Sequence, residues 1–197
     1  RQRQMCIRDR LYLDCDLIVE GDISKLYDIE LGNCEVAAVR SEDFRLLSKT
    51  KSPIFLEGYP YNVDNYRTEA LGMQVPENYF NAGVLVIDLK KTRQRINQEQ
   101  VFEILHRHNY KYNDQDVLNI LFDGRVKVMD CRWNYMTYIP EQIAKENVNN
   151  RKLYEDLYRE KPCIIHYTSA EKPWNTETKV LGDRYWKYRN EMEAIYA

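Results

Sequence analysis

The stretch 12–19 reads Tyr-Leu-Asp-Cys-Asp-Leu-Ile-Val and places two carboxylates one residue apart, directly after a short apolar run. If the run Leu11–Leu13 ends a strand, the alternation of side chains along it puts Asp14 and Asp16 on the same side. Two hard oxygen ligands that point into one space suit a divalent cation such as Mg²⁺ or Mn²⁺. The alternative is a solvated Asp-x-Asp turn, so the rest of the sequence must decide between the two.

The composition is that of one globular domain. The chain has 197 residues, of which 44% are hydrophobic and 30% charged, and its net charge of −2 gives no electrostatic footprint for nucleic acid. The sixteen tyrosines fit either a sugar-binding surface or a tyrosine-rich core. Five widely spaced cysteines without zinc-ligand spacing favour reduced thiols in a cytosolic protein. No apolar run reaches the roughly 18 residues of a transmembrane helix.

Strand and helix patterns alternate along the chain, which predicts an α/β fold. The expected strands are 11–13, 35–39, 79–88, 125–129 and 163–167. The expected helices are 23–31, with Asp22 as N-cap and Gly32 as its stop; 92–108, with Ile96, Val101, Phe102 and Leu105 on one side; 114–122, which Asp114 could cap; and 182–195. Residues 40–77 hold three of the six prolines and little periodicity, and such irregular segments are often functional.

Four segments follow one another at compatible spacing. They are residues 12–16 with Gly21, Asp22, Ile23 and Leu26; residues 79–84; residues 113–119; and His166-Tyr167 followed by Lys172-Pro173-Trp174. This order resembles glycosyltransferase family 8, the retaining nucleotide-sugar transferases that include glycogenin and bacterial lipopolysaccharide galactosyl- and glucosyltransferases. Each motif alone is weak, but the resemblance runs from residue 11 to about residue 188. It implies a GT-A-like mixed sheet flanked by helices.

The resemblance implies a cation site. Asp14, Asp16 and His166 would bind Mn²⁺, with Mg²⁺ as the alternative, and the cation would bridge the two phosphates of a UDP-sugar. Lys172 would lie against the same diphosphate and add positive charge where negative charge develops on the departing UDP. Outside the resemblance, a histidine beside a tyrosine is more often a packed or capping residue, and a lysine before Pro-Trp is usually solvated.

The resemblance also implies a sugar site. Asn81, Ala82, Asp114 and Gln115 would surround the transferred sugar, with Asp114 and Gln115 as the catalytic residues. Small residues such as Asn-Ala-Gly inside a strand let another backbone or a ligand approach closely, although a β-bulge is the alternative. An amide is a poor nucleophile, so Gln115 fits charge stabilisation in a front-face attack better than covalent catalysis. The acids at 114 and 116 could equally complement the dipole of a helix N-terminus.

Two features depart from the family pattern. Ser169 stands where the family usually has glycine, so its hydroxyl would either donate to the diphosphate or crowd it. Family members also carry a leading βαβ portion that binds uracil and ribose, and such a unit takes about 30 residues. Residues 1–10 look instead like a non-native leader or a frayed terminus. We therefore expect 11–197 to be a partial catalytic domain that lacks those strands, exposes apolar sheet surface, binds nucleotide poorly and is inactive alone.

The function that the resemblance implies is hexose transfer. A UDP-sugar would donate glucose or galactose to a glycan or lipid-linked glycan acceptor, such as a lipopolysaccharide core. No nucleic acid partner is expected, and the full-length parent would be cytoplasmic or peripheral at the inner membrane face. Two alternatives stay open: a non-catalytic carbohydrate-binding or scaffold protein on the same fold, and a metal-dependent phosphohydrolase. The phosphohydrolase needs a second metal's ligands or a water-activating base, and the sequence has no dense acidic cluster to supply them.

Overall fold

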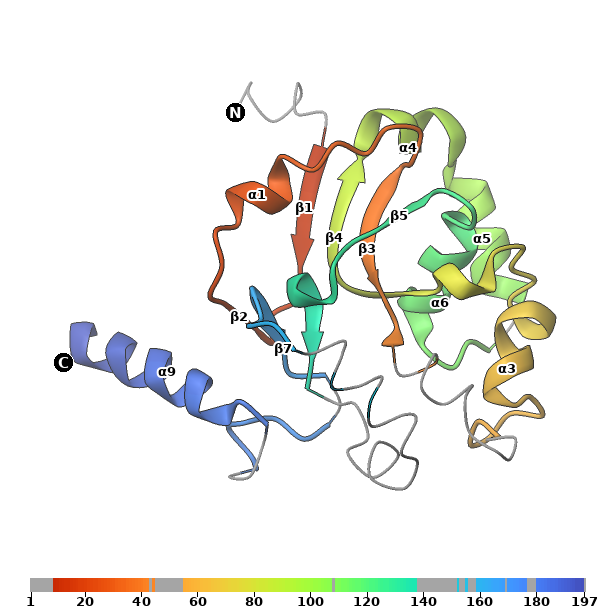
Figure 1. Cartoon of the computed structure of the whole chain (residues 1–197). Coiled ribbons are helices and arrows are strands. Elements are labelled where there is room, and N and C mark those ends of the chain that lie inside the picture. The colour runs from red at the N-terminus through yellow and green to blue at the C-terminus, as the bar shows by residue number, and fades with distance from the viewer. Residues whose placement is uncertain are drawn as a thin grey trace.

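The strands form two mixed sheets (Figure 1). The computed structural model describes residues 9–42, 44, 55–107, 109–137, 152, 155, 159–168, 170–176 and 180–196. The larger sheet has the order β1-β4-β3-β5, made of β1 (Asp9–Leu13), β4 (Phe80–Asp88), β3 (Val36–Arg40) and β5 (Val126–Val128). The smaller sheet has the order β2-β7-β6, made of β2 (Leu17–Val19), β7 (Ile164–His166) and β6 (Tyr135–Met136). The pairs β3–β5 and β6–β7 are parallel and the others antiparallel, so the expected mixed sheet is confirmed.

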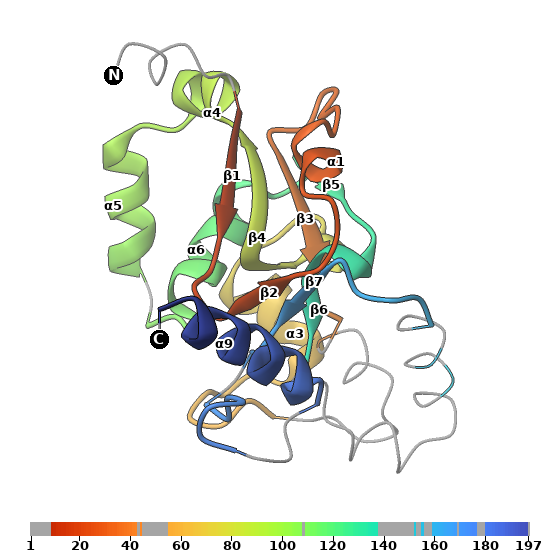
Figure 2. The same cartoon turned by 90° about the vertical axis from the view of Figure 1, so that its left-hand side faces the viewer.

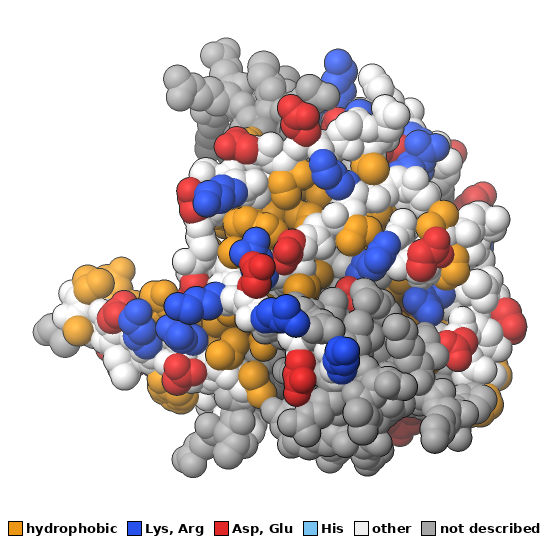
Figure 3. Space-filling model, viewed as in Figure 1, with side chains coloured by type: hydrophobic (Ala, Val, Ile, Leu, Met, Phe, Trp, Pro, Cys, Tyr) orange, Lys and Arg blue, Asp and Glu red, His pale blue; other side chains and the backbone are white. Residues whose placement is uncertain are grey.

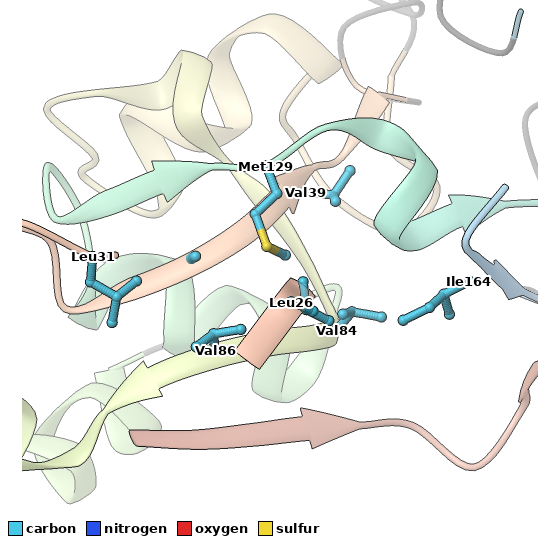
Figure 4. Packing of buried hydrophobic residues seen from close by; sticks show 8 residues of the cluster. Leu26, Leu31, Val39, Val84, Val86, Met129 and Ile164 are labelled. Carbon is cyan, nitrogen blue, oxygen red and sulfur yellow. The ribbon is translucent and has the colours of Figure 1, made fainter. Parts of the chain in front are cut away.

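Strands β3 and β4 are mainly apolar because both of their faces are buried. Val84 and Val86 of β4 point into one core, whereas Leu85 between them points into another. In β3, Ala37 joins the first core and Ala38 the second. Figure 4 shows the first core from close by. Alternation within a sheet that is covered on both sides explains why residues 84–87 form a continuous apolar run.

Helices lie on both sides of the larger sheet (Figure 2). On one side α4 (Leu89–Arg95) and α6 (Asn113–Leu121) pack against β4, and α5 (Gln98–Arg107) packs against α6. On the other side the short α1 (Ser24–Tyr27) buries Leu26 in the first core. The other helical elements whose bounds the structure describes are α3 (Val63–Asn65), a π-helical turn (Tyr66–Ala70), two 3₁₀ turns (Pro76–Asn78 and Cys131–Asn134) and α9 (Gly182–Tyr196), which extends away from the body. Across the described ranges, none of the helices combines the length and apolarity that a bilayer crossing requires.

A third core lies under the irregular segment and holds many of the tyrosines. It contains Phe44, Leu56, Val63, Tyr66, Leu71, Met73 and Tyr79, with Tyr59, Tyr61, Tyr110 and Tyr112 packed against them. The rings meet edge to face, as in the Tyr59–Tyr66 pair, whose centroids lie 5.9 Å apart at 82°. For these six tyrosines the structure supports the core interpretation of the high tyrosine content.

The helix expected at 92–108 is two helices, α4 and α5, separated by Ile96 and Asn97. The Gln100 N–H donates to Asn97 Oδ1 at 2.9 Å, and the Asn97 N–H donates to Gln100 Oε1 at 3.0 Å. This reciprocal pair is a capping box, which starts a new helix. In α5 Ile104 is buried, whereas Phe102 and Leu105, both expected on the apolar side, are each 48% exposed.

The helix expected at 23–31 is shorter, because α1 makes only one turn. Ile23, not Asp22, occupies the N-cap position, and its side chain makes no capping bond. The Asp22 carboxylate, one residue earlier, accepts hydrogen bonds from the Ser24 N–H at 3.0 Å and from the Ser24 hydroxyl at 2.7 Å. The helix ends at Asp28, and Gly32 adopts φ +56° four residues later. The glycine therefore serves a turn in the following loop and does not stop the helix.

Strand β1 begins at Asp9, two residues earlier than expected, and forms one edge of the larger sheet. Among the described strands it pairs with β4 alone. Leu11 and Leu13 are only partly buried against the first core. Figure 3 shows apolar side chains at the surface over β1 and β4, so this edge of the sheet is incompletely covered by the described residues.

Candidate metal and sugar site

The two aspartates lie where the two sheets meet. The Asp14 N–H donates to the Gly83 carbonyl at 2.9 Å, which extends the pairing of β1 with β4 by one residue. The chain then bends and enters β2, and the Asp16 carbonyl accepts the Tyr167 N–H at 3.1 Å. Asp14 is thus fixed to the larger sheet and Asp16 to the smaller one.

His166, the last residue of β7, completes a group of three candidate ligands. Its Nε2 lies 3.3 Å from Asp16 Oδ1 and 3.7 Å from Asp14 Oδ2. One ligand atom from each of the three residues lies within 4.8 Å of the other two. The imidazole is almost fully buried, whereas the Asp14 side chain is 36% exposed, so the group opens to solvent on the Asp14 side. The structure therefore brings together the three residues predicted as metal ligands.

Gly83 makes room for this group. A Cβ at position 83 would lie 2.2 Å from His166 Cε1, 2.7 Å from its Nδ1 and 2.9 Å from Asp14 Oδ2. Gly83 does allow a close approach, but the approaching group is the imidazole of the same chain and is neither another backbone nor a ligand. The pairing of β3 with β4 also shifts register in this stretch, between the pairs Ala38–Leu85 and Arg40–Phe80, which agrees with the alternative of a bulge. Two carboxylates and an imidazole gathered in this way are a donor set that fits Mn²⁺, and the residues present fit the implied cation.

Lys172 stands beside the same group. Its Nζ forms an ion pair with Asp16 Oδ2 and donates a hydrogen bond to the Tyr167 carbonyl. Burial by itself would raise the pKa of Asp16, but the contacts of its carboxylate with His166 and Lys172 outweigh burial and hold that pKa well below its usual 3.8. Asp16 is therefore an anion near neutral pH, as a cation ligand must be.

Tyr12 contacts the other aspartate and was not predicted as a site residue. Its hydroxyl donates to Asp14 Oδ1 at 2.7 Å, and this hydrogen bond is the main cause that raises the pKa of Tyr12 to about 12. The Asp14 Oδ2 atom remains directed toward His166. The sequence does contain a signal for Tyr12, because residues two apart at the end of a strand share one side and Tyr12 stands two residues before Asp14.

The residues predicted around the sugar lie next to the metal ligands. Gln115, in the first turn of α6, accepts hydrogen bonds through its Oε1 from Asn81 Nδ2 at 3.0 Å and from the Ala82 N–H at 3.3 Å. Asp114 is exposed beside them, and its charge contributes to the raised pKa of Tyr12. The structure thus places Asn81, Ala82, Asp114 and Gln115 at one place, between β4 and the start of α6.

Asp116, not Asp114, holds the start of α6. The helix begins at Asn113 with Tyr112 as N-cap, and no side chain caps it at that position. The fully buried Asp116 carboxylate accepts the Tyr112 N–H at 2.8 Å and the hydroxyls of Tyr66 at 2.7 Å and Tyr79 at 2.6 Å. The expectation that Asp114 caps the helix is wrong, because the helix starts one residue earlier and a buried acid takes the backbone donor.

Asn134 touches His166 and was also not predicted. It ends the 3₁₀ turn Cys131–Asn134, is fully buried, and its Oδ1 lies 2.8 Å from His166 Nδ1. No local pattern marks it, since only the folded chain brings the two residues together. Ser169, predicted beside the diphosphate, lies outside the described residues.

Comparisons with known proteins identify the family of the chain. Residues 6–178 match the profile of Glycosyl transferase family 8. General stress protein A of Bacillus subtilis (strain 168) is 30% identical over 188 residues, which cover 92% of this chain and 58% of the relative. Lipopolysaccharide 1,2-glucosyltransferase of Escherichia coli (strain K12) is 31% identical over 182 residues, which cover 90% of this chain and 47% of the relative. The solved galactosyltransferase LgtC, in complex with donor and acceptor sugar analogs, has a TM-score of 0.62 at 30% identity, covering 92% of this chain and 60% of LgtC.

The chain spans about half the length of the curated relatives it matches. Within that span the profile match includes the segments around Asp14, Asn81, Gln115 and His166. The mixed α/β architecture is that of GT-A-like glycosyltransferases, as expected. The sequence match, the shared fold and the gathered site lead to one conclusion: this chain belongs to glycosyltransferase family 8.

Proposed function

We propose that the chain carries the cation and sugar contacts of a retaining glycosyltransferase that moves a hexose from a UDP-sugar to a glycan acceptor. The observation that carries the proposal is the convergence of Asp14, Asp16 and His166 beside Asn81 and Gln115. The names of the Escherichia coli glucosyltransferase and of LgtC favour glucose or galactose as the sugar. A glycan or lipid-linked glycan is the acceptor by the same analogy.

The three ligands would hold Mn²⁺, with Mg²⁺ as the alternative. When bound, the cation supplies Lewis-acid stabilisation of the negative charge that develops on the departing UDP. Lys172, now paired with Asp16, would add a second positive charge to the same diphosphate. Tyr12 holds Asp14 by one oxygen and leaves the other free to bind.

Gln115 and Asp114 would act on the sugar. The Gln115 oxygen is held by Asn81 and the Ala82 N–H, so its dipole has a fixed direction before any substrate arrives. A fixed dipole can stabilise the positive charge of an oxocarbenium-like transition state without reorganising. Asp114 is exposed at the same place and can accept hydrogen bonds from sugar hydroxyls.

Two further proposals concern the whole protein. Because the chain spans about half of its curated relatives, we propose that residues 11–197 supply part of the catalytic domain and bind nucleotide weakly by themselves. A reducing, cytoplasmic setting is supported by the four described cysteines, which are free thiols. Peripheral placement at the inner membrane face would then suit a lipid-linked acceptor.

Metal and donor binding test the proposal together. Electron paramagnetic resonance of free Mn²⁺ gives the metal affinity, and saturation-transfer NMR with Mg²⁺ detects even weak binding of UDP-glucose or UDP-galactose. We expect one Mn²⁺ site in the unmodified chain, donor binding that requires the cation, and loss of both in Asp16→Asn. Glu103→Gln, which removes an exposed charge on α5, is the matched control and keeps both.

The alternatives predict different results. Sugar binding that is indifferent to the cation and to Asp16→Asn would support a carbohydrate-binding or scaffold protein. Release of phosphate from p-nitrophenyl phosphate would support a phosphohydrolase. The structure does not favour the latter, because Asp14, Asp16 and His166 are the sole ligand group of three found among the residues it describes.

A further inference from the structure

A line of hydrogen bonds leads from His166 away from the cation site. His166 Nδ1 meets Asn134 Oδ1 at 2.8 Å, and Asn134 Nδ2 donates to Asn81 Oδ1 at 2.8 Å. Asn81 Nδ2 in turn donates to Gln115 Oε1 at 3.0 Å, and Gln115 Nε2 donates to the Tyr79 hydroxyl at 3.0 Å. The line therefore joins the predicted metal ligand to the predicted sugar contacts through Asn134.

Two backbone amides fix the direction of this line. A backbone N–H can only donate, so the side-chain atom that it contacts must be an acceptor oxygen. The Gly83 N–H contacts Asn81 at 3.0 Å, and the Ala82 N–H contacts Gln115 at 3.3 Å. The amide oxygens of Asn81 and Gln115 are thereby located, and the Asn81 nitrogen must point toward Gln115.

The direction at Asn81 determines the protonation of His166. The Asn81 oxygen requires a donor from Asn134, so the Asn134 nitrogen faces Asn81 and its oxygen faces the imidazole. His166 Nδ1 must then carry a hydrogen. In a neutral imidazole the other nitrogen, Nε2, holds the lone pair, and Nε2 is the atom that faces Asp14 and Asp16.

We infer that Asn134 is a positioning residue that holds His166 in the Nδ1–H tautomer, with the Nε2 lone pair directed between the two aspartates. The inference deepens the proposed function and rests on its cation site. Asn134 is fully buried and His166 nearly so, so water does not replace this contact easily. The Asn134 side chain contacts both the His166 imidazole and Asn81. It therefore orients a predicted metal ligand and a predicted sugar contact together.

Three variants separate this role from simple packing. Asn134→Leu removes the acceptor for His166 Nδ1 and the donor to Asn81. Asn134→Asp keeps an acceptor for Nδ1–H, in a carboxylate–histidine pair of the kind that supports metal ligands, and loses only the donor to Asn81. Thr137→Val is the control, because the buried Thr137 hydroxyl donates to the His166 carbonyl at 3.2 Å and does not touch the ring.

The first measurement is the tautomer itself, by ¹⁵N NMR of histidine-labelled, metal-free protein at pH 9, where a free histidine is neutral. We expect His166 with Nδ1 protonated in the unmodified chain, in Asn134→Asp and in Thr137→Val. A neutral ring with its hydrogen on Nε2 and none on Nδ1 in the unmodified chain would overturn the inference. This measurement needs neither a bound cation nor a well-folded Asn134→Leu variant.

The second measurement is the Mn²⁺ dissociation constant by electron paramagnetic resonance. Asn134→Leu should weaken Mn²⁺ binding by roughly 10- to 100-fold, the usual effect of losing a residue that supports a metal ligand. Asn134→Asp and Thr137→Val should bind within about threefold of the unmodified chain. Equal losses in Asn134→Leu and Thr137→Val would reduce Asn134 to a packing role. If the unmodified chain bound no Mn²⁺ at all, the proposed function would be contradicted. The inference about Asn134 would then be tested by the tautomer measurement alone.

Discussion

Gly83 lacks the one atom that would collide with His166, and its replacement is therefore a test of the site. In Gly83→Ala the new Cβ would overlap the imidazole, so the ring must turn away from Asp14. We expect Mn²⁺ binding to weaken at least tenfold and the free energy of unfolding to fall by about 1–3 kcal/mol, as overpacking usually costs. Paramagnetic resonance and urea unfolding measure the two effects.

Gly72→Ala is the control for that variant. Gly72 has φ +69° and open space around it, so a methyl group there strains the backbone without meeting the site. It should lower stability and leave Mn²⁺ binding unchanged. If Gly83→Ala bound Mn²⁺ as well as Gly72→Ala does, the imidazole would not be a ligand.

Asp16 predicts a specific dependence of stability on pH. A carboxyl whose pKa is lower in the folded state stabilises the fold above its unfolded pKa, and this contribution is lost as pH falls through the folded value. For Asp16 the loss therefore begins near pH 3.8 and continues below it. We expect the free energy of unfolding from urea titrations to fall less steeply between pH 4 and pH 2 in Asp16→Asn than in the unmodified chain. An unchanged slope would show that His166 and Lys172 do not lower this pKa.

The residues of the site differ in how far the sequence reveals them. Asp14 and Asp16 are visible as a motif, and the resemblance supplies His166, whose approach to them only the folded chain can show. Tyr12 follows from strand alternation once its hydroxyl is considered. Asn134 carries no local signal, because its partners lie on other elements and are reached only through tertiary contacts.

At the scale of elements, α5 starts anew at the capping box of Asn97 and Gln100 and buries a different side from the one expected. Ile104 is buried on that side, whereas Phe102 is 48% exposed. Ile104→Ala should lower the free energy of unfolding by about 2 kcal/mol or more, because it leaves a cavity. Phe102→Ala should change it by less than about 1 kcal/mol, as expected for a surface position. Urea unfolding compares the two variants. A larger loss in Phe102→Ala than in Ile104→Ala would favour the apolar side expected from the sequence.

The elements that the sequence predicted best are those with long patterns. Residues 79–88 are apolar on both faces and form β4 almost to the residue, and α9 follows the expected 182–195 closely. Strands β2 and β6 were missed, because three and two residues are too short to show alternation. The break between α4 and α5 was missed because an apolar period can continue across a capped junction.

At the scale of the whole molecule, the tyrosine-rich third core supports the site through Asp116. Tyr66 donates to the Asp116 carboxylate deep in this core, and burial of that hydroxyl raises the pKa of Tyr66. Tyr66→Phe should lower the free energy of unfolding by about 1–3 kcal/mol, because a buried carboxylate loses a donor. Tyr27→Phe, at an exposed tyrosine, should have little effect. Equal effects in urea unfolding would show that the Tyr66 hydroxyl contributes nothing.

The division of the candidate ligands between two sheets has a mechanical consequence. Asp14 is fastened to β4, whereas Asp16 and His166 belong to the strands of the smaller sheet. An ion bound by all three residues would link the two sheets. Because it would bind the folded state and not the unfolded chain, it would also stabilise the fold. Hydrogen exchange along β2 and β7 should therefore slow when Mn²⁺ is added, while α5, which packs against α6 and not against the smaller sheet, keeps its rate. The ion would then hold the two sheets together as well as take part in the chemistry.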